Sequence, residues 1–318
     1  NPICSMAILS PLTGKDNTEL IEEIQTSDLT RLYKKLGFSE LKELKPYQTI
    51  GLYRCLDTDL RFFYPQATGE AEFYEVLQQN EWYYLEGKSE YLYAESLISK
   101  GDKVLDVGCG RGQFGSQISS KAEFTGLEFN DEAIKKAHAA GLNVVKQSIE
   151  EHSIENEGKY DMVTSFQVLE HIGNSKDFIR ASLSAVKPGG NLVVSVPSYD
   201  SLVSVQLNNT LNLPPHHMSW WSDEALRSLA GLFDMELITI HHEELDDAHK
   251  QWYSFLLIAE ALKKIIGFKS TRKVIDTSFS LKAIHGVAKL LSPLLARGLT
   301  DKRLTPYGHS VTAVYRKR

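Results

Sequence analysis

The chain has 318 residues and a mass of 35.8 kDa, with 42% hydrophobic and 24% charged residues. This composition argues against disordered and fibrous proteins and leaves room for one large domain or two. The three cysteines lack the spacing of a disulfide framework, so we expect a reducing compartment, the cytoplasm. The longest apolar runs fall far short of a membrane span, and no signal-peptide pattern follows Asn1, so neither kind of segment is expected.

The net charge of −6 is unevenly distributed along the chain. Residues 261–318 contain 13 Lys and Arg but only two Asp, which gives this segment a net charge of +11 and residues 1–260 a net charge of −17. A basic segment beside an acidic body can bind an anionic molecule or pair with the body itself. No stretch resembles a nucleic-acid-binding motif, and the net negative charge argues against general affinity for nucleic acid.

Hydrophobic periodicity predicts the order of helices and strands. Residues 1–68 show no clear period, so we expect a small irregular lobe with one helix over 17–25, which Asn17 or Thr18 can cap. Helices are expected over 70–99. Strands are expected at 103–108, 123–129, 142–147, 160–166 and 191–198, with helices at 112–120, 130–141 and 175–186. There follow a helix at 222–233, a strand at 235–242, a helical segment over 247–299 and a strand at 309–317.

Strands and helices alternate from residue 103 onward. This alternation predicts an α/β fold with a doubly wound, mainly parallel sheet of seven strands. The irregular lobe precedes the sheet in sequence, and the helical segment is inserted before the last strand. We therefore expect a cap lobe at 1–68, a ligand-binding domain at 69–246 and 305–318, and a helical lid at 247–304.

The stretch "KVLDVGCGRGQFG" ends the first of these strands with Gly108, Gly110 and Gly112. Ligands of doubly wound sheets bind at the carboxyl ends of the strands. Glycine allows a tight turn there and a close approach of the backbone to a ligand. The dinucleotide fingerprint G-x-G-x-x-G needs a glycine where Gln113 stands, so NAD fits poorly.

Two acidic residues stand at the ends of neighbouring strands. Glu128 ends the second strand and is placed to accept hydrogen bonds from ribose hydroxyls, as in sites for nucleoside cofactors generally. Asp106, near the end of the first strand, would repel a pyrophosphate but suits a cationic ligand. Both acids therefore favour a nucleoside cofactor other than a dinucleotide.

Four motifs, "VLDVGCGRGQFG", "GLEFNDEAIKKA", "YDMVTSFQVLEHI" and "VKPGGNLVVSVPS", resemble in this order those of class I S-adenosylmethionine-dependent methyltransferases. The resemblance covers roughly residues 85–245 and the last strand, and it implies a Rossmann-like fold, the cofactor S-adenosylmethionine and the product S-adenosylhomocysteine. The residues that it assigns to cofactor binding are Asp106, Gly108, Cys109, Gly110, Gly112, Glu128, Phe129, Gln147, Ser148, Ile149, Phe166, Gln167 and Tyr84.

The resemblance also implies what these residues contact. The glycine loop and its acid hold the methionine end, Glu128 holds the ribose, and 147–149 lie beside the adenine. Phe166 and Gln167 line the sulfonium side. The commonest pattern has an Asp at the third strand end, where this chain has Gln147 and Ser148.

An aromatic cluster, "EWYYLEG", precedes the first strand. Because an aromatic face attracts a sulfonium, Trp82, Tyr83 and Tyr84 can close over the cofactor. Packing within the core of the amino-terminal helices is the alternative.

A loop with two histidines, "LNLPPHHMSWWS", follows the fifth strand. Methyl transfer from a sulfonium is an in-line displacement that needs an aligned acceptor, and a base only where that acceptor is weakly acidic. His217, or else His216, is the candidate base, because histidine titrates near neutrality. The alternative is a structural role for both, as we expect for His171 in "LEHI". The side chains expected to wall the acceptor pocket are Trp220 and Trp221.

The stretches "SPLTGK" and "YRCLDTDLRFFYP" resemble a small zinc-binding lobe, C-P-x-C-G followed by Y-x-C-x-x-C, of some saccharide and natural-product methyltransferases. Ser10, Thr13 and Thr58 stand at three of the cysteine positions, and only Cys55 remains. One thiolate cannot make a tetrahedral zinc site, so we expect no metal. The lobe would then serve as a substrate cap or as a packing element.

The basic insertion carries two apolar stretches, 252–268 and 283–299, with lysines between them. One interpretation is a helical lid packed on the body, its Lys and Arg solvated. The other is a binding surface for an anionic acceptor, such as a nucleotide sugar or a lipid-linked glycan, or for an anionic membrane.

Together these features predict an enzyme of biosynthesis that methylates a hydroxyl of a small polar acceptor, a saccharide or a secondary metabolite, without a metal. N- or C-methylation is the alternative among enzymes. A scaffold that binds S-adenosylmethionine or S-adenosylhomocysteine without catalysis is the alternative of another class. The expected partner is a small molecule and not a nucleic acid, with peripheral membrane contact as a further option.

Overall fold

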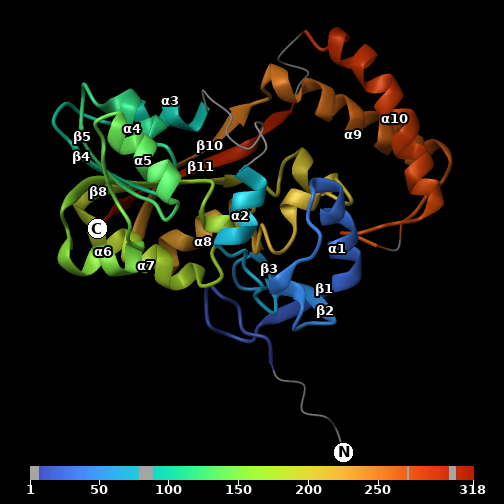
Figure 1. Ribbon diagram of the computed structural model, residues 1–318, viewed down its shortest axis with the longest axis horizontal. Helices are drawn as coiled ribbons and strands as arrows, with labels where there is room; N and C mark the ends of the chain where they lie inside the picture. Colours follow the sequence, from blue (N-terminus) through green and yellow to red (C-terminus); the bar gives the residue numbers. More distant parts are fainter. Residues whose placement is uncertain (1–6, 79–88, 271, 301–305) are drawn as a thin grey trace, which may run out of the picture.

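The computed structural model describes residues 7–78, 89–270, 272–300 and 306–318 and contains two β-sheets (Figure 1). One sheet has seven strands in the order β10-β11-β8-β7-β4-β5-β6, and the other has four in the order β1-β2-β3-β9. Two long helices near the carboxyl terminus, α9 and α10, lie to one side of the seven-stranded sheet (Figure 1).

The seven-stranded sheet confirms the predicted α/β, Rossmann-like fold. Its strands are β4 Lys103–Val107, β5 Glu123–Leu127, β6 Asn143–Val145, β7 Tyr160–Phe166, β8 Val186–Pro197, β10 Met235–Glu244 and β11 Tyr307–Lys317. β4 pairs in parallel with β5 and β7, and so do β5 with β6 and β7 with β8. β11 runs antiparallel to both of its neighbours, β8 and β10.

Helices cover both faces of this sheet because its central strands are apolar on both sides. Leu105 and Val163 lie in the core on one face, whereas their neighbours Val104 and Met162 lie in the core on the other. The helices on the first face are α6 Ile149–Glu155, α7 Ser175–Ala185 and α8 Asp223–Leu232, and those on the second are α3 Ser89–Ser96, α4 Gln113–Ile118 and α5 Asp131–Ala139 (Figure 1). Among these, α6 is the helix that the sequence analysis did not anticipate.

The helix expected over 17–25 is wrong, because β1 Thr18–Gln25 pairs antiparallel with β2 Thr49–Cys55. This pairing supplies hydrogen bonds along the segment and buries Ile24, which outweighs the helix propensity of its glutamates. β2 pairs in turn with β3 Arg61–Tyr64, and β3 with β9 Ser219–Trp220. The lobe expected to be irregular is therefore an antiparallel sheet, which a strand from the later sequence completes.

The helical segments of the lobe and of the connections complete the fold. They are α1 Thr26–Tyr33, α2 Ala71–Gln78, and the 3₁₀ turns η1 Lys34–Leu36, η2 Lys42–Leu44, η4 Leu169–His171, η5 Leu202–Val205, η6 Thr210–Asn212 and η7 Asp247–His249. The division at residues 68 and 246 stays a prediction, since β9 joins the lobe sheet although it lies within 69–246.

The predicted helical insertion before the last strand is present as α9 Lys250–Ile265 and α10 Phe279–Gly298. The two helices pack on each other through Ala259, Ile284 and Ala288. Leu256 of α9 also packs on Leu202 and so joins the insertion to the body. Within the described ranges, no helix combines the length and the apolar character that a membrane crossing requires.

Candidate functional site

The glycine loop connects β4 to α4 at the carboxyl end of β4. Gly108, Gly110 and Gly112 have φ values of 74°, 55° and 77°, the left-handed region that glycine adopts without steric cost. The backbone N–H of Gly108 donates to the carbonyl of Leu127 at 2.8 Å, which fastens the loop to β5. A Cβ atom at Gly110 would meet no atom within 4 Å, so open space lies in front of this part of the backbone. The loop therefore offers the close approach that the predicted cofactor needs.

Glu128 is positioned directly beside this loop. Its Oε2 accepts the backbone N–H of Gly110 at 2.9 Å, and its Oε1 accepts those of Phe129 and Asn130 at 2.8 and 2.9 Å. The side chain of Phe129 is 61% exposed. The acid predicted to hold the ribose is thus fixed at the strand edge by three backbone donors, and its contact with a ribose stays a prediction.

Asp106 and Cys109 lie deeper in the site. Asp106 is buried, and the hydroxyl of Thr164 on β7 donates to its Oδ1 at 2.8 Å. Burial, with the charges of Asp106 and Glu128, raises the pKa of the Cys109 thiol, which therefore stays protonated. A Cβ atom at Gly126 would lie 2.4 Å from Cys109 Sγ, so the thiol fills the space that this glycine leaves. The thiol of Cys109 therefore packs within the loop, and the contact of this residue with the cofactor stays a prediction.

The segment assigned to the adenine, 147–149, is occupied by structural contacts. Ser148 caps α6: its hydroxyl accepts the N–H of Glu151, whose carboxylate accepts the N–H of Ser148. The side chain of Ile149 is buried in the core, and Gln147 Oε1 lies 3.0 Å from His152 Nδ1. Adenine binding here stays a prediction.

The residues assigned to the sulfonium side follow β7. The ring of Phe166 is buried against Phe114 and Tyr91, so its side chain belongs to the core. Gln167 has a φ of 58°, a strained conformation that is enriched at functional sites, and its Nε2 donates to Ser310 Oγ at 3.0 Å. Tyr84, with Trp82 and Tyr83, lies outside the described residues.

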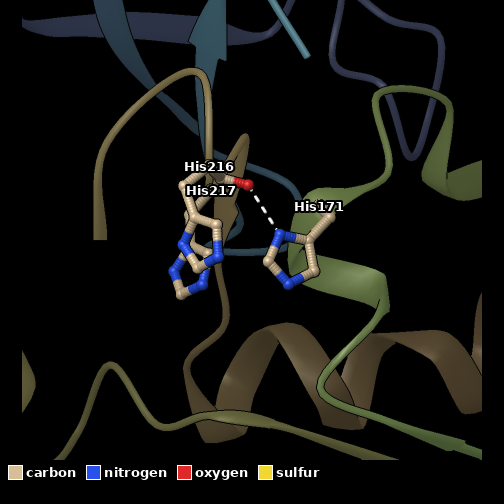
Figure 2. Close-up of side chains that lie close together, drawn as sticks. All are labelled: His171, His216 and His217. Carbon is tan, nitrogen blue, oxygen red and sulfur yellow. Dashed lines mark hydrogen bonds between the residues drawn. The ribbon is translucent and has the colours of Figure 1, made fainter. Parts of the chain in front are cut away.

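The histidine loop is held against the segment that follows β7. The backbone N–H of Met218 donates to the carbonyl of Glu170 at 2.7 Å, and His171 Nδ1 donates to the carbonyl of His216 at 2.6 Å. Figure 2 shows the rings of His216 and His217 stacked on each other and facing the ring of His171. The structure thus brings both candidate bases together with the histidine expected to be structural.

Burial dominates the chemistry of the two candidate bases. It lowers the pKa of His216 to about 3, with a further contribution from His171. It also lowers the pKa of His217 well below the ordinary histidine value, helped by both neighbouring histidines. Both rings are therefore neutral near pH 7. A neutral imidazole can accept a proton or bind a metal ion, and the base role of His217 stays a prediction.

The two tryptophans have separate environments. Trp221 is fully buried in the main core and donates its Nε1–H to Ser219 Oγ at 2.9 Å, so it does not wall an open pocket. Trp220 is partly exposed and lies against Phe63 and Tyr199. The expectation of an acceptor wall is therefore wrong for Trp221.

The positions that resemble cysteine ligands in the lobe are used for local hydrogen bonds. Ser10 Oγ accepts the N–H groups of Leu12 and Thr13 at 3.3 and 3.4 Å, and Thr58 Oγ1 accepts that of Leu60 at 3.3 Å. Cys55 is a buried free thiol. Hydroxyl groups therefore stabilise the two turns of this part of the lobe.

A second cluster at the same edge of the sheet escaped the sequence analysis. Glu243 of β10, His249 of η7 and His309 of β11 each place a potential ligand atom within 4.8 Å of the others. His309 Nδ1 lies 2.8 Å from Glu243 Oε1, whose carboxylate also accepts the hydroxyl of Ser89. Glu243 and His249 are six positions apart, but His309 follows about 60 positions later, and no local motif predicts that it joins them.

A cavity of about 630 Å³ lies between α9 and the segment that follows β8. Its lining combines apolar side chains with acidic groups, among them Leu202, Tyr253, Leu256, Asp200 and Glu260. The insertion therefore contributes one wall of a space large enough for a small molecule.

Comparison with known proteins places this site in a family. A family model described as a methyltransferase domain matches residues 80–240, half of the chain. Ubiquinone biosynthesis O-methyltransferase of Cronobacter sakazakii is 39% identical over 102 residues, 30% of this chain and 42% of that protein, so the chain spans less than half of this relative. The enzyme of the same name from Vibrio parahaemolyticus is 29% identical over 207 residues, 54% of this chain and 85% of that protein.

Among solved structures, a SAM-dependent methyltransferase from Archaeoglobus fulgidus is similar with a TM-score of 0.46 at 18% identity, covering 71% of this chain and 94% of that one. The family model spans the glycine loop, Glu128 and the histidine loop in one match. The chain therefore belongs to the methyltransferase family, and the class I S-adenosylmethionine-dependent type recognised from its motifs is confirmed.

Proposed function

We propose that the chain transfers a methyl group from S-adenosylmethionine to a hydroxyl oxygen of a small polar acceptor. The observation that carries this proposal is the pairing of the open backbone at Gly110 with the fixed carboxylate of Glu128 at neighbouring strand ends. Such a pair suits a nucleoside cofactor, with the methionine end on the loop and the ribose on the acid. The cofactor supplies an activated methyl group, so the chain's own residues align the acceptor and exclude water.

The choice of oxygen rests on the relatives, which are named ubiquinone biosynthesis O-methyltransferases. A saccharide or a secondary metabolite is the acceptor class that we propose. N- or C-methylation uses the same cofactor residues and would be recognised by the bond formed in the product. A non-catalytic scaffold would bind S-adenosylhomocysteine and transfer nothing.

The histidine loop is the part of the chain that we assign to the acceptor side. Asn212 Oδ1 accepts the Nδ1–H of His217 at 2.9 Å, which leaves the lone pair on Nε2. This loop contacts the segment after β7, where Val168 lies close to the glycine loop: a Cβ atom at Gly108 would be 2.5 Å from Val168 Cγ2. The acceptor oxygen would therefore meet the histidines next to the cofactor.

We further propose that the insertion meets an anionic lipid surface, in keeping with a lipid-linked or otherwise anionic acceptor. On α10, Val287, Leu290 and Leu294 are exposed and lie on one face by their spacing. Lys282 and Lys289 are exposed along the side of that face. An apolar face bordered by cations is the arrangement that lies in the headgroup region of an anionic membrane.

Transfer of labelled methyl groups into fractionated cell extract tests the main proposal. We expect label in a single small-molecule or glycolipid fraction, carried on oxygen, and a strong reduction with Asp106→Ala. Binding of S-adenosylhomocysteine, measured by calorimetry with NAD as the comparison ligand, separates the alternatives. Cofactor binding without transfer into any pool would favour the scaffold, and preference for NAD would overturn the proposal.

A further inference from the structure

Three histidines lie close together where the histidine loop contacts the segment that follows β7, although these two segments are about 45 residues apart in sequence. A ring nitrogen of each of His171, His216 and His217 lies within 4.8 Å of those of the other two. His216 and His217 are more than nine-tenths buried, and His171 is largely buried. Buried imidazoles at this spacing are a common set of ligands for a transition metal.

Hydrogen bonds select the same tautomer in all three rings. The Nδ1–H of His171 donates to the carbonyl of His216, that of His216 to the carbonyl of Leu211 at 2.7 Å, and that of His217 to Asn212 Oδ1. A neutral imidazole carries one N–H, so the lone pair of each ring is on Nε2. Metal-binding histidines are oriented in this way, with the second nitrogen bonded to a carbonyl or carboxylate oxygen.

A carboxylate completes the set. Glu170 is 1% exposed, and its Oε1 lies 3.8 Å from His171 Nε2 and 4.0 Å from His217 Nε2. Ligand atoms around a tetrahedral zinc ion are about 3.4 Å apart, so shifts of about 1 Å would bring these groups to bonding positions.

We propose that His171, His216 and His217, together with Glu170, bind one zinc-like divalent transition-metal ion. Imidazole nitrogen favours zinc, cobalt, nickel and copper over magnesium and calcium, which take oxygen ligands. The proposal departs from the expectation of no metal, which rested on the lost cysteines of the lobe. With Nε2 of His217 bound to the ion, that ring would be a ligand and could not serve as the base. The ion would tie the histidine loop to the segment after β7, next to the glycine loop and on the acceptor side of the proposed site.

The metal content of the purified protein tests this proposal independently of methyl transfer. The full chain is incubated with Zn²⁺ and passed through gel filtration to remove loosely bound metal. The zinc that remains per chain is then measured by inductively coupled plasma mass spectrometry. We expect one equivalent of zinc in the wild type and at most about one tenth of that in His217→Ala and His171→Ala. Cobalt in place of zinc should give the visible absorption bands of a four-coordinate site. Wild-type protein that retains no zinc would overturn the proposal.

Two controls assign the metal to this cluster. His241→Ala removes a histidine that stacks on Tyr93 outside the cluster, and it should retain the full equivalent. His249→Ala disrupts the rival cluster on η7, β10 and β11 and should also retain it. Loss of zinc in His249→Ala with retention in His217→Ala would assign the ion to the rival cluster and refute ours. If circular dichroism shows that the cluster variants do not fold, the melting temperature with and without zinc is compared between the wild type and His249→Ala. The same zinc-induced increase in both proteins would support the proposal. No increase in His249→Ala would refute it.

Discussion

The carboxylate of Glu128 accepts the backbone N–H of Gly110 at 2.9 Å and so joins the loop after β4 to the end of β5. This bond links the two features from which the sequence predicted a nucleoside cofactor. It also explains why an acid, and not an amide, suits this position: the side chain serves three backbone donors and offers only acceptor atoms. The ribose site and the loop conformation are therefore expected to change together.

Replacing Glu128 with glutamine tests this coupling. The amide NH₂ cannot accept a hydrogen bond, so at least one backbone donor loses its partner. We expect the free energy of unfolding to fall by about 1–2 kcal/mol and the affinity for S-adenosylhomocysteine to fall roughly tenfold or more. Denaturant unfolding and calorimetry measure the two effects. Glu123→Gln, at the exposed start of β5, is the matched control and should change neither.

Gly110→Ala tests whether the open space at the loop belongs to the cofactor. The matched control is Gly141→Ala, since both glycines have a positive φ and neither Cβ atom would meet protein within 4 Å. The two variants should therefore lose similar stability, about 1–2 kcal/mol each, from the strained φ. Only Gly110→Ala should weaken S-adenosylhomocysteine binding, by tenfold or more. Equal affinities in the two variants would place the cofactor elsewhere.

The seven-stranded sheet was predictable because its signal is local. The strands β4, β5 and β7 are short apolar runs, each followed by a helix pattern. Their residues are apolar on both faces of the sheet, as Leu105 and its neighbour Val104 show. Helix α6 had a local signal too, since Ser148 and Glu151 form a capping box that the sequence displays.

What the sequence did not disclose depends on contacts between distant segments. β1 looks like a helix because of its glutamates, and only its partner β2, some 30 residues later, makes it a strand. His171 has no local feature that relates it to His216 and His217. The meeting of the three rings follows from the hydrogen bond between Met218 and Glu170, which no periodicity predicts.

Asp59 joins the lobe to α8 and makes stability depend on pH. Its carboxylate accepts hydrogen bonds from Ser222, Arg61 and Arg54. Partial burial acts to raise the pKa of Asp59, but these hydrogen bonds outweigh it and hold the pKa below the ordinary value of 3.8. A lowered pKa means that this stabilisation is fully present above about pH 4 and is lost as the pH falls through the folded-state value.

Asp59→Asn should therefore lower the free energy of unfolding at pH 7, while the difference from the wild type shrinks as the pH falls below about 4. Denaturant unfolding at a series of pH values between 7 and 3 measures this difference. Asp57→Asn, at a more exposed carboxylate of the same turn, is the control. A difference that stays constant over this range would mean that Asp59 acts through packing and not through its charge.

The exposed face of α10 predicts binding to anionic lipid vesicles. Leu290 and Leu294 are 77% and 65% exposed. The double variant Leu290→Glu/Leu294→Glu would place two negative charges in the headgroup region. Its affinity for the vesicles, measured by sedimentation, should fall at least tenfold. Leu92→Glu, 64% exposed on α3, should bind like the wild type. Wild-type binding should weaken with added salt, because Lys282 and Lys289 contribute electrostatic attraction. If the double variant instead dissociates an oligomer and leaves vesicle binding intact, the face is a contact between copies of the chain.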